Sequence, residues 1–567
     1  MASDRIRSPI RLSFRNRTAP VRHPDSMENE FPSPASLPRD DRGGAGHSPV
    51  PQALADGVVP PIDPNLRHLQ TGHLLVDLRG RTISSGIITV SAQGVLFVIT
   101  LVSTMTLARL LSPRDFGLVA MVTTVTGFLR VFKDAGLSTA TVQKEGITHA
   151  QVSTLFWINL GLGGASTLIV AALAPVIAWF YSEPLLVPVT LAIAATFLLN
   201  GSTVQHQALL SRQMRFKASA LVDIGSVTTG YCTGITMALL GCGYWSLVGL
   251  SLAVEASCAV LTWSVCRWRP QLPRRGTEVG PLLSFGANLT GASFISYITR
   301  NTDSLLIGRV YGAAAVGLYS RALGLLSRPL QQFLSPIDAV FQPALSRLQN
   351  EPERYRRTFL QLYEVMAVAG FVAAGLFLAL SYPLTLVLLG PKWERAAPIF
   401  AALALVALYA PISAPAYWLF VTQGRGRDTL VSNSVGSVAT IGAIFVGLPF
   451  GPFGVAIALS TAGLLIRLPI LFYLAGRRGA VSAADMWRVF FRHVPIWLVA
   501  LGTAYLPLTL VPHAPPLARL AIGGSIGSVA VLGFALARRP HREVVLRMVA
   551  IVQGLVRPKS PVPSPES

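Results

Sequence analysis

Apolar segments long enough to cross a membrane follow one another along most of this chain. Crossing about 30 Å of hydrocarbon takes about 20 helical residues, and from Thr82 onward runs of that length are separated by short polar stretches. Only helices and closed barrels satisfy every backbone hydrogen bond in lipid, so we predict an all-α polytopic membrane protein. Fourteen transmembrane helices are expected, over residues 82–108, 116–138, 152–180, 185–208, 218–239, 244–266, 282–308, 314–345, 358–389, 396–422, 429–449, 452–475, 494–512 and 516–537.

The composition supports this prediction, because a chain surrounded by lipid needs few charges. Charged residues make up 13% of the 567 residues and apolar residues 51%, whereas about 25% of an average soluble domain is charged. This excludes an ordinary cytosolic enzyme. We expect no metal site and no cofactor, since no CxxC or Cys/His spacing occurs around the cysteines, which are Cys232, Cys242, Cys258 and Cys266.

The positive charge is distributed as membrane topology requires. A net charge of +21 would suggest a nucleic-acid partner for a soluble protein, but here Lys and Arg form short clusters between the apolar runs. No nucleic-acid partner is therefore predicted. With the N-terminus inside, most of the loop arginines and lysines fall in inner loops, and positively charged loops stay on the cytoplasmic side. We predict that both termini are cytoplasmic.

The chain divides into five predicted regions. Residues 1–80 are rich in Pro, Ser, Asp and Arg without apolar periodicity, which is typical of a disordered cytoplasmic tail. Translation could start at Met1 or at Met27. The remaining regions are an N-lobe of helices one to six (81–275), a C-lobe of helices seven to twelve (276–480), an interfacial helix with helices thirteen and fourteen (481–540), and a basic cytoplasmic tail (541–567).

An internal repeat supports the two lobes. Shifting the chain by 200 residues aligns helix one with helix seven through six identities: Ser84 with Ser284, Gly86 with Gly286, Ala92 with Ala292, Arg109 with Arg309, Gly117 with Gly317, and Leu118 with Leu318. An offset of six helices leaves both halves in the same orientation, with their axis along the membrane normal. Two six-helix lobes around a central cavity are typical of an alternating-access transporter. Arg109 and Arg309 should then occupy equivalent outer helix ends, where we expect them to cap carbonyl groups.

Several motifs carry a resemblance to a known family. They are Arg300-Asn301-Thr302-Asp303-Ser304-Leu305-Leu306-Ile307-Gly308-Arg309 with Gly312, Gly317, Leu318, Tyr319, Ser320, Arg321, Ala322 and Pro329-Leu330-Gln331; Ala108-Arg109-Leu110-Leu111-Ser112-Pro113 with Asp115-Phe116-Gly117; Pro343-Ala344-Leu345-Ser346-Arg347-Leu348-Gln349; and Gly390 with Lys392-Trp393 and Pro398. Over residues 80–540 the chain resembles the oligosaccharide flippases of the MOP superfamily, most closely the O-antigen and colanic-acid exporter type found among lipopolysaccharide biosynthesis proteins.

The resemblance implies a MATE-like fold in the bacterial inner membrane. It also implies a flippase that moves undecaprenyl-pyrophosphate-linked oligosaccharide units from the inner to the outer leaflet for O-antigen, capsule or exopolysaccharide synthesis. Its partners would be the lipid-linked oligosaccharide and membrane lipid, with a polysaccharide polymerase and a chain-length regulator as further candidates. The resemblance identifies no particular sugar and no catalytic residues.

Charges within spanning helices are the candidate site residues, because each costs several kcal/mol unless water or a partner compensates it. A guanidinium matches the oxygens of a pyrophosphate. The cavity candidates are Arg300, Arg321 and Arg328, followed by Asp303, Arg130 and Arg467, and the candidate for ion coupling is Glu255.

Each candidate also has a structural interpretation. Arg300 and Asp303 are three residues apart and could neutralise each other. Arg130 and Arg467 could extend to the inner interface. Glu255 could be a neutral, hydrogen-bonded buried residue.

Three other functions are considered. A MATE-type multidrug or cation antiporter would be expected to carry a carboxylate in its first helix, whereas residues 82–108 contain no charge. A membrane polysaccharide polymerase would need a sizeable catalytic outer loop, and the predicted outer loops are short. A lipid II flippase is distinguished from an oligosaccharide exporter only by the motif around Asp303.

Two local features are also predicted. Pro329, Pro336 and Pro343 recur every seven residues and should bend helix eight. Residues 485–492 and 542–557 should form basic amphipathic helices on the inner leaflet.

Overall fold

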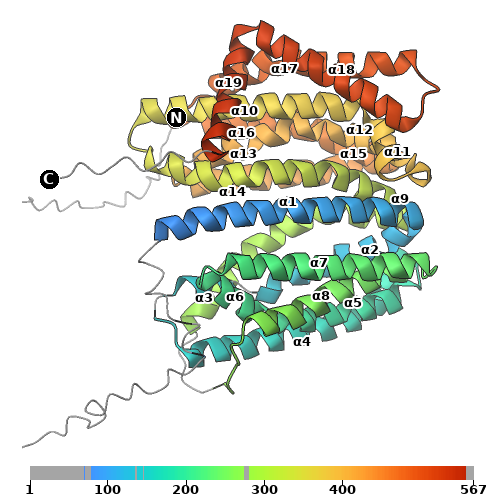
Figure 1. Ribbon diagram of the computed structural model, residues 1–567, viewed down its shortest axis with the longest axis vertical. Coiled ribbons are helices and arrows are strands. Elements are labelled where there is room, and N and C mark those ends of the chain that lie inside the picture. Colours follow the sequence, from blue (N-terminus) through green and yellow to red (C-terminus); the bar gives the residue numbers. More distant parts are fainter. Residues whose placement is uncertain are drawn as a thin grey trace, which may run out of the picture. The chain divides into compact units, whose positions relative to one another are not determined.

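The computed structural model describes Asn65, Leu69 and residues 78–134, 137–144, 146–273 and 280–556. Most of the predicted tail 1–80, and residues 557–567, lie outside the described residues. The chain divides into Met1–Pro61 and Ile62–Ser567, and the structure below is that of the second unit. Its described residues form helices joined by turns, with no β-strand among them (Figure 1).

The helices lie side by side along most of their lengths (Figure 1). As far as the structure describes it, the N-terminal half contains α1 (Leu78–Leu110), α2 (Pro113–Asp134), α3 (Leu137–Gln143), α4 (His149–Tyr181), α5 (Leu186–Gly201), α6 (Val204–Arg212), α7 (Phe216–Leu239) and α8 (Trp245–Val265). The C-terminal half contains α9 (Gly280–Arg347), α10 (Pro352–Ala379), α11 (Ser381–Leu388), α12 (Ala396–Ala404), α13 (Val406–Thr422), α14 (Gly426–Gly447), α15 (Gly451–Ala462), α16 (Leu468–Gly476), α17 (Ala483–Leu510), α18 (Pro516–Ala537) and α19 (Arg539–Val556). Tighter or wider turns are the 3-10 helices η4 (Pro391–Trp393) and η5 (Leu448–Phe450) and the π-helix η6 (Gly463–Arg467).

Every predicted transmembrane span falls on one or more of these helices. The spans 282–308 and 314–345 both belong to α9, whose backbone leaves the helical region only at Gly312, with φ 78°. Glycine reaches this region because it has no Cβ atom. The kink at Gly312 therefore separates the two predicted helices.

Two local predictions fare differently from the spans. The α9 backbone keeps helical φ and ψ angles at Pro329, Pro336 and Pro343. These angles do not measure the curvature of the helix, so the bend expected there stays a prediction. The interfacial helix expected over 485–492 is not a separate element, since α17 runs unbroken from Ala483 to Leu510. Its start is set by a capping box between Ser482 and Asp485, which satisfies two backbone N–H groups of the first turn.

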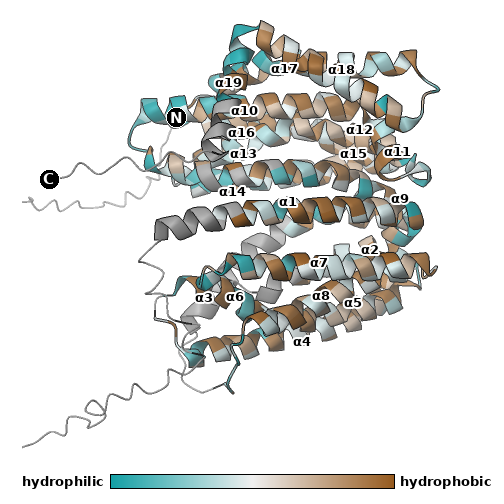
Figure 2. Cartoon of the chain, in the orientation of Figure 1, coloured by the Kyte–Doolittle hydropathy of each residue, from teal (hydrophilic) through white to brown (hydrophobic). Residues whose placement is uncertain are grey.

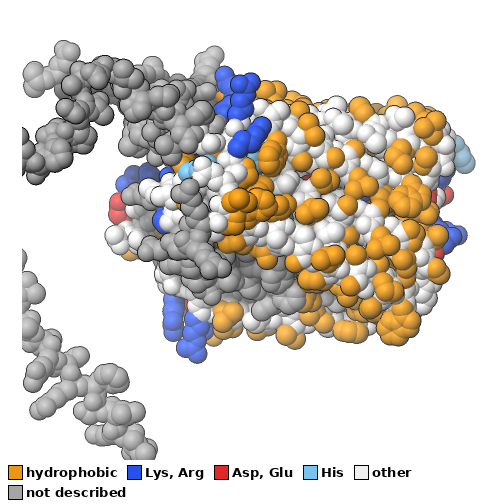
Figure 3. All heavy atoms as spheres, turned by 90° about the horizontal axis from the view of Figure 1, so that it is seen from below, with side chains coloured by type: hydrophobic (Ala, Val, Ile, Leu, Met, Phe, Trp, Pro, Cys, Tyr) orange, Lys and Arg blue, Asp and Glu red, His pale blue; other side chains and the backbone are white. Residues whose placement is uncertain are grey.

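The apolar surface of the helices identifies a multi-pass membrane protein. Within the described residues, eight helical segments are long and apolar enough to span a membrane, or nine if α12 and α13, which meet at a 40° bend, count as one span. One of the eight, Gly426–Gly476, covers two predicted spans. Apolar residues extend along the helices, and hydrophilic residues concentrate toward their ends (Figure 2). In the face shown in Figure 3, Lys and Arg lie at the two ends of an apolar band.

A repeated turn extends the internal symmetry that the aligned helices predict. Gln213-Met214-Arg215 joins α6 to α7, and Gln423-Gly424-Arg425 joins α13 to α14. The central residues both adopt the left-handed conformation, with φ 52° at Met214 and 65° at Gly424. The following arginines have nearly the same backbone angles, φ −80° and ψ 53° against φ −88° and ψ 54°. The two halves thus share a turn of the same backbone conformation.

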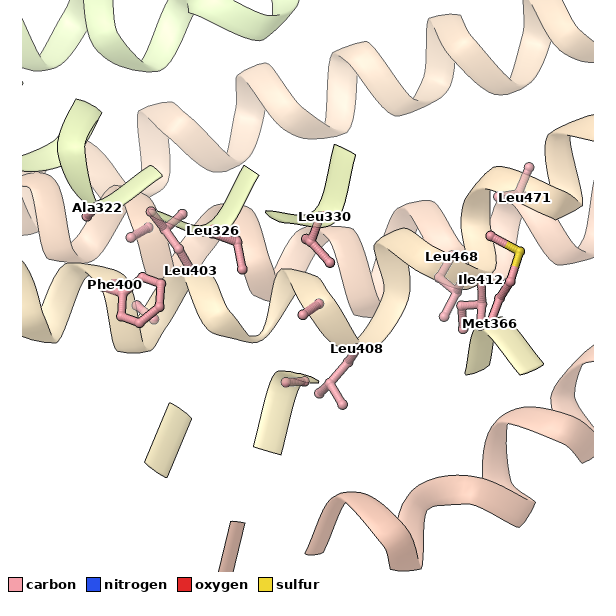
Figure 4. Close-up of a cluster of buried hydrophobic side chains, with 14 of the residues drawn as sticks. Ala322, Leu326, Leu330, Met366, Phe400, Leu403, Leu408, Ile412, Leu468 and Leu471 are labelled. Atoms are coloured by element: carbon pink, nitrogen blue, oxygen red, sulfur yellow. The ribbon is translucent and has the colours of Figure 1, made fainter. Parts of the chain in front are cut away.

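The main buried cluster of apolar side chains joins both halves of the chain. It includes Met121 and Val122 of α2 together with Ile307 and Val316 of α9. The same cluster continues in the C-terminal half, where Ala322, Leu326 and Leu330 of α9 lie near Phe400, Leu403 and Leu408 (Figure 4). Further along, Met366, Ile412, Leu468 and Leu471 lie together in the same cluster.

Close helix packing in lipid depends on small residues, because lipid tails are as apolar as the side chains and give no hydrophobic drive. In α4 and α5, a Cβ atom placed on Gly163 would lie 2.7 Å from the carbonyl oxygen of Phe197, and one on Gly201 would lie 2.7 Å from that of Asn159. The two helices therefore touch backbone to backbone at these glycines.

We predict that Gly163→Leu destabilises the protein and that Gly161→Leu does not. The new side chain at position 163 would meet backbone that cannot yield, and overpacking of this kind costs about 1–3 kcal/mol. Position 161 lies on the same helix with no atom within 4 Å of a Cβ, so it controls for the change in helix propensity. Thermal unfolding in detergent should show a lower melting temperature for the first variant alone. Equal melting temperatures would contradict the packing described.

Candidate functional site

The two halves of the chain meet at two glycines that the internal repeat aligns with each other. A Cβ atom placed on Gly117 of α2 would overlap the carbonyl oxygen of Ala313, and one on Gly317 of α9 would overlap that of Pro113. Residue 117 thus meets residue 313 as residue 317 meets residue 113. Such reciprocal contacts are the signature of a two-fold relation. We call this contact between residues 113–117 and 313–317 the glycine contact.

A second set of hydrogen bonds holds the C-terminal end of α1, which directly precedes α2, to the C-terminal half of the chain. The Trp393 indole donates to the carbonyl oxygen of Ala108 at 2.8 Å, and the Lys392 ammonium donates to that of Arg109 at 3.2 Å. Trp393 is fully buried and meets the Phe116 ring edge-on, with ring centroids 5.3 Å apart. These donors satisfy carbonyls that a helix end leaves free, so η4 closes the end of α1.

Arg109 and Arg309 both lie beside the glycine contact, at the end of α1 and just before the kink of α9. The Arg109 guanidinium donates to the carbonyl oxygen of Val387, in the last turn of α11, at 2.9 Å. The expected carbonyl capping therefore occurs, on a neighbouring helix. Arg309 instead donates to the Ser182 hydroxyl at 3.5 Å and lies over the ring of Phe180.

Asp303 is buried and bonded to a tyrosine. Its side chain accepts a hydrogen bond from the Tyr319 hydroxyl at 2.7 Å and one from the backbone N–H of Ser304 at 2.6 Å. Asp303 is 6% exposed. Arg300 is exposed on the same helix and makes no ion pair with Asp303 within the described residues. The mutual neutralisation considered from their spacing is therefore not formed.

Arg321 reaches across the interface between the two halves. Its guanidinium carbon lies 4.8 Å from the ring centroid of Phe116 on α2, a cation–π distance. Its Nε atom is buried and has no hydrogen-bond partner in the described part of the chain. Arg328, seven residues later, shares the same helix face and is exposed. This arginine pair could meet an anionic group at the interface between the halves.

The remaining arginine candidates do not join this pair. Arg467 is exposed in the π-helix η6, and its Nε atom lies 3.3 Å from the position of a Cβ on Gly436 of α14. Arg300 is exposed on the part of α9 that precedes the kink at Gly312. The side chain of Arg130 lies outside the described residues. The predicted arginines are therefore spread over several helices.

Glu255 lies in the N-terminal half, bonded to an amide. It is partly buried in α8 and accepts a hydrogen bond from the Asn200 side-chain amide at 3.2 Å. One turn further along α8, the Cys258 sulfur accepts from the Gln207 amide at 3.3 Å. The carbonyl oxygen of the Asn200 side chain is buried without a hydrogen-bond partner in the described residues. These bonds fix two amides on α5 and α6.

The same two amides line a pocket of about 360 Å³, which we call the amide pocket. Its polar lining consists of hydroxyl and amide side chains from α3, α5 and α6: Ser138, Thr139, Gln143, Asn200, Gln207 and Ser211. None of its lining residues is charged. Hydroxyls and amides both donate and accept hydrogen bonds, so the pocket suits a neutral ligand rich in hydroxyl groups. Sequence reasoning missed it because its residues come from three separate helices without a motif.

Arg212 holds one wall of the amide pocket in place. Its guanidinium donates to the carbonyl oxygens of Thr141 at 2.9 Å and Lys144 at 2.8 Å, at the end of α3. A cation at a helix C-terminus is favourable because the last carbonyls there are unpaired and partly negative. The buried Thr141 hydroxyl also donates to the side chain of Gln205 on α6 at 2.8 Å. The walls from α3 and α6 are thus tied together.

We predict that Gly317→Leu opens the glycine contact, because its side chain would meet the backbone of Pro113. In a background with the native cysteines replaced by serine, a cysteine placed at Ala313, which is 7% exposed, should react with maleimide several-fold faster in this variant than in the parent.

Gly324→Leu is the matched control for this experiment. It lies on the same helix with no atom within 4 Å of a Cβ, and it should leave the reactivity unchanged. Equal reactivity in all three proteins would show that the glycine contact does not keep α2 and α9 together.

Comparisons with known proteins agree with this architecture. The chain resembles the lipid II flippase MurJ in its inward closed conformation, with a TM-score of 0.62 and 14% identity over 81% of this chain and 100% of MurJ. It also resembles an inward-facing multidrug resistance MATE family transporter of the MOP superfamily, with a TM-score of 0.52 and 13% identity over 69% and 96% of the two chains. The predicted all-α, MATE-like membrane fold is therefore confirmed.

Sequence relatives identify the family. The lipopolysaccharide biosynthesis protein WzxC of Escherichia coli (strain K12) is 25% identical over 439 residues, which cover 75% of this chain and 88% of WzxC. The succinoglycan biosynthesis transport protein ExoT of Rhizobium meliloti (strain 1021) is 30% identical over 354 residues, covering 60% and 69%. The profile of a family described as polysaccharide biosynthesis protein matches residues 106–398. The chain belongs to this polysaccharide biosynthesis protein family.

Proposed function

We propose that this chain is a flippase that moves undecaprenyl-pyrophosphate-linked oligosaccharide units from the inner to the outer leaflet for surface polysaccharide synthesis. The observation that carries the proposal is Arg321, a cation at the interface between the two halves whose Nε atom has no partner in the described chain. An arginine in this position is tolerable when a ligand or water compensates it. A pyrophosphate group offers the matching oxygens.

Two separate places in the molecule would supply different chemistry for such a substrate. Arg321 and Arg328 lie on one face of α9 and would meet the pyrophosphate as it passes between the halves. The amide pocket, with its uncharged hydroxyl and amide lining, would hold sugar hydroxyls. Glu255, fixed by Asn200 behind this pocket, is our candidate for coupling transport to an ion.

We further propose that the protein resides in the bacterial inner membrane with both termini cytoplasmic. Arg212, Arg425 and Arg477 then lie on the cytoplasmic side, as positively charged loops require, and the glycine contact lies on the outer side. With the outer side closed, the substrate would enter from the cytoplasm. The halves would act as an N-lobe over 81–275 and a C-lobe over 276–480, with the last helices attached to the C-lobe.

The proposed role is transport, with no chemical conversion of the substrate. WzxC is named as a lipopolysaccharide biosynthesis protein and ExoT as a succinoglycan biosynthesis transport protein. By analogy, the substrate of this chain would be a lipid-linked repeat unit. A polysaccharide polymerase and a chain-length regulator are the partners that this role implies.

We predict that deleting the gene causes one undecaprenyl-linked oligosaccharide to accumulate, as measured by mass spectrometry of the lipid extract. Wild-type protein should clear it. Arg321→Ala should leave it at least tenfold elevated, and Arg321→Lys should clear it only in part because the charge remains without the planar fork. Accumulation of lipid II instead would favour the rival flippase.

Arg519→Ala is the matched control. Arg519 also lies over an aromatic ring, that of Tyr382 at 5.6 Å, and its Nε atom is likewise buried without a hydrogen-bond partner in the described residues. It lies on α18, away from the interface between α2 and α9. If both variants clear the oligosaccharide like the wild type while inserting normally, Arg321 has no role in transport.

A further inference from the structure

Four arginines converge on one pocket at the opposite end of the molecule from the glycine contact. The pocket has a volume of about 540 Å³ and lies between the turn that joins α13 to α14 and the end of α16. Its charged lining is Arg425, Arg427, Asp428, Arg477 and Arg478. We call it the arginine pocket.

The position of the pocket follows from α14. The C-terminal end of α14 lies near the kink of α9, because the Tyr311 hydroxyl donates to the carbonyl oxygen of Leu448 at 2.7 Å. Tyr311 is next to Gly312 in the chain. The N-terminal end of α14, at Gly426, therefore lies at the far end of a helix of 22 residues, which is about 33 Å long. That length matches the thickness of a membrane.

Arg425 lines the pocket and is held in place by several hydrogen bonds. Its guanidinium donates to the carbonyl oxygens of Ala475 and Arg478, each at 2.8 Å, and to the Asp428 carboxylate at 2.9 Å. Only 11% of its side chain is exposed. These bonds tie the start of α14 to the end of α16, so the backbone that carries the other arginines is held in place.

One carboxylate serves two of the four arginines. Asp428, whose side chain is 5% exposed, bridges Arg425 and Arg477. Arg427 and Arg478 are both exposed and form no ion pair or hydrogen bond through their side chains within the described residues. The pocket therefore keeps an excess of positive charge on two free guanidinium groups.

The start of α14 adds to this positive potential. Helix N-termini carry free N–H groups and the positive end of the helix dipole, and no side chain caps this one. The acidic residue of its first turn, Asp428, already bridges Arg425 and Arg477. Like-charged groups repel each other, and membrane topology alone would only require arginines in the loop. A bound anion would compensate the repulsion between arginines that line a single pocket.

Apolar side chains beside the pocket point to an anion carried by a lipid. Val431 lines the pocket and is 39% exposed, and its neighbour in the chain, Leu430, is 67% exposed. Tyr473, one turn before Arg477 on α16, is 64% exposed. Exposed apolar side chains of a membrane protein face lipid chains, so the cationic pocket opens beside the hydrocarbon surface.

We propose that the arginine pocket binds the phosphate group of a lipid, with Arg427 and Arg478 as its direct contacts. Forked guanidinium donors match phosphate oxygens, and basic pockets at the ends of membrane helices bind anionic headgroups. The source of the phosphate is either the headgroup of an anionic phospholipid or the pyrophosphate of a lipid-linked sugar. This site is separate from Arg321, and its existence does not depend on the proposed transport function.

The test uses the full-length purified protein and binding measured by native mass spectrometry and calorimetry. The probes are short-chain phosphatidylglycerol, short-chain phosphatidylcholine and short-chain polyprenyl pyrophosphate, with inorganic pyrophosphate as the lipid-free probe. We expect the wild type to bind at least one of the two anionic lipids, and R427Q/R478Q to bind it at least tenfold more weakly. Whichever lipid binds more tightly identifies the source of the phosphate.

R347Q/R357Q is the matched control, because it removes the same charge from two exposed arginines at the α9–α10 connection. It should bind the lipid like the wild type. R427K/R478K should bind with intermediate affinity, which also shows that substitutions at these positions leave the protein folded. Equal weakening in both glutamine variants, equal binding of phosphatidylcholine, or binding of inorganic pyrophosphate alone would overturn the proposal.

Discussion

The backbone contact between α2 and α9 joins the two halves of the chain at one end of their interface. In lipid, two helices gain nothing by hiding apolar side chains from each other, so they associate through close packing and polar bonds. Gly117 and Gly317 permit an approach at which any Cβ atom would overlap a carbonyl group of the other helix. Trp393 and Lys392 then fasten the end of α1 to the same place. One end of the interface between the halves is closed as a result.

The end at the glycine contact is closed, whereas the opposite end of the molecule contains pockets. Both described pockets lie there or near it: the amide pocket is lined by α3, α5 and α6, and Figure 1 shows α3 and α6 at the end away from α11. One pocket is neutral and the other cationic, which would suit the sugar and the phosphate of the substrate proposed above. Arg321 stands between the closed end and these pockets, stacked on Phe116 of the other half.

Sequence reasoning predicted the helices well and the contacts between them poorly. The spans were predictable because each reflects a local run of apolar residues, and the internal repeat aligned Gly117 with Gly317. It did not show that these glycines meet the backbone of residues 313 and 113, since alignment carries no information about which helix faces which. Spacing also paired Arg300 with Asp303, whereas Asp303 turns inward to Tyr319. The repeated turns escaped notice because Met214 and Gly424 do not align in the register that matches the first and seventh helices.

In the proposed orientation the glycine contact closes the outer side, and we expect it to part during transport, so that two conformations interconvert. Spin labels at Arg114 and Ala314, which the internal repeat places at equivalent positions beside the contact, measure this directly by pulsed electron paramagnetic resonance in liposomes. We expect a short distance in the resting protein and a second, longer distance that gains population when lipid-linked oligosaccharide is supplied. A single short distance under both conditions would contradict this expectation.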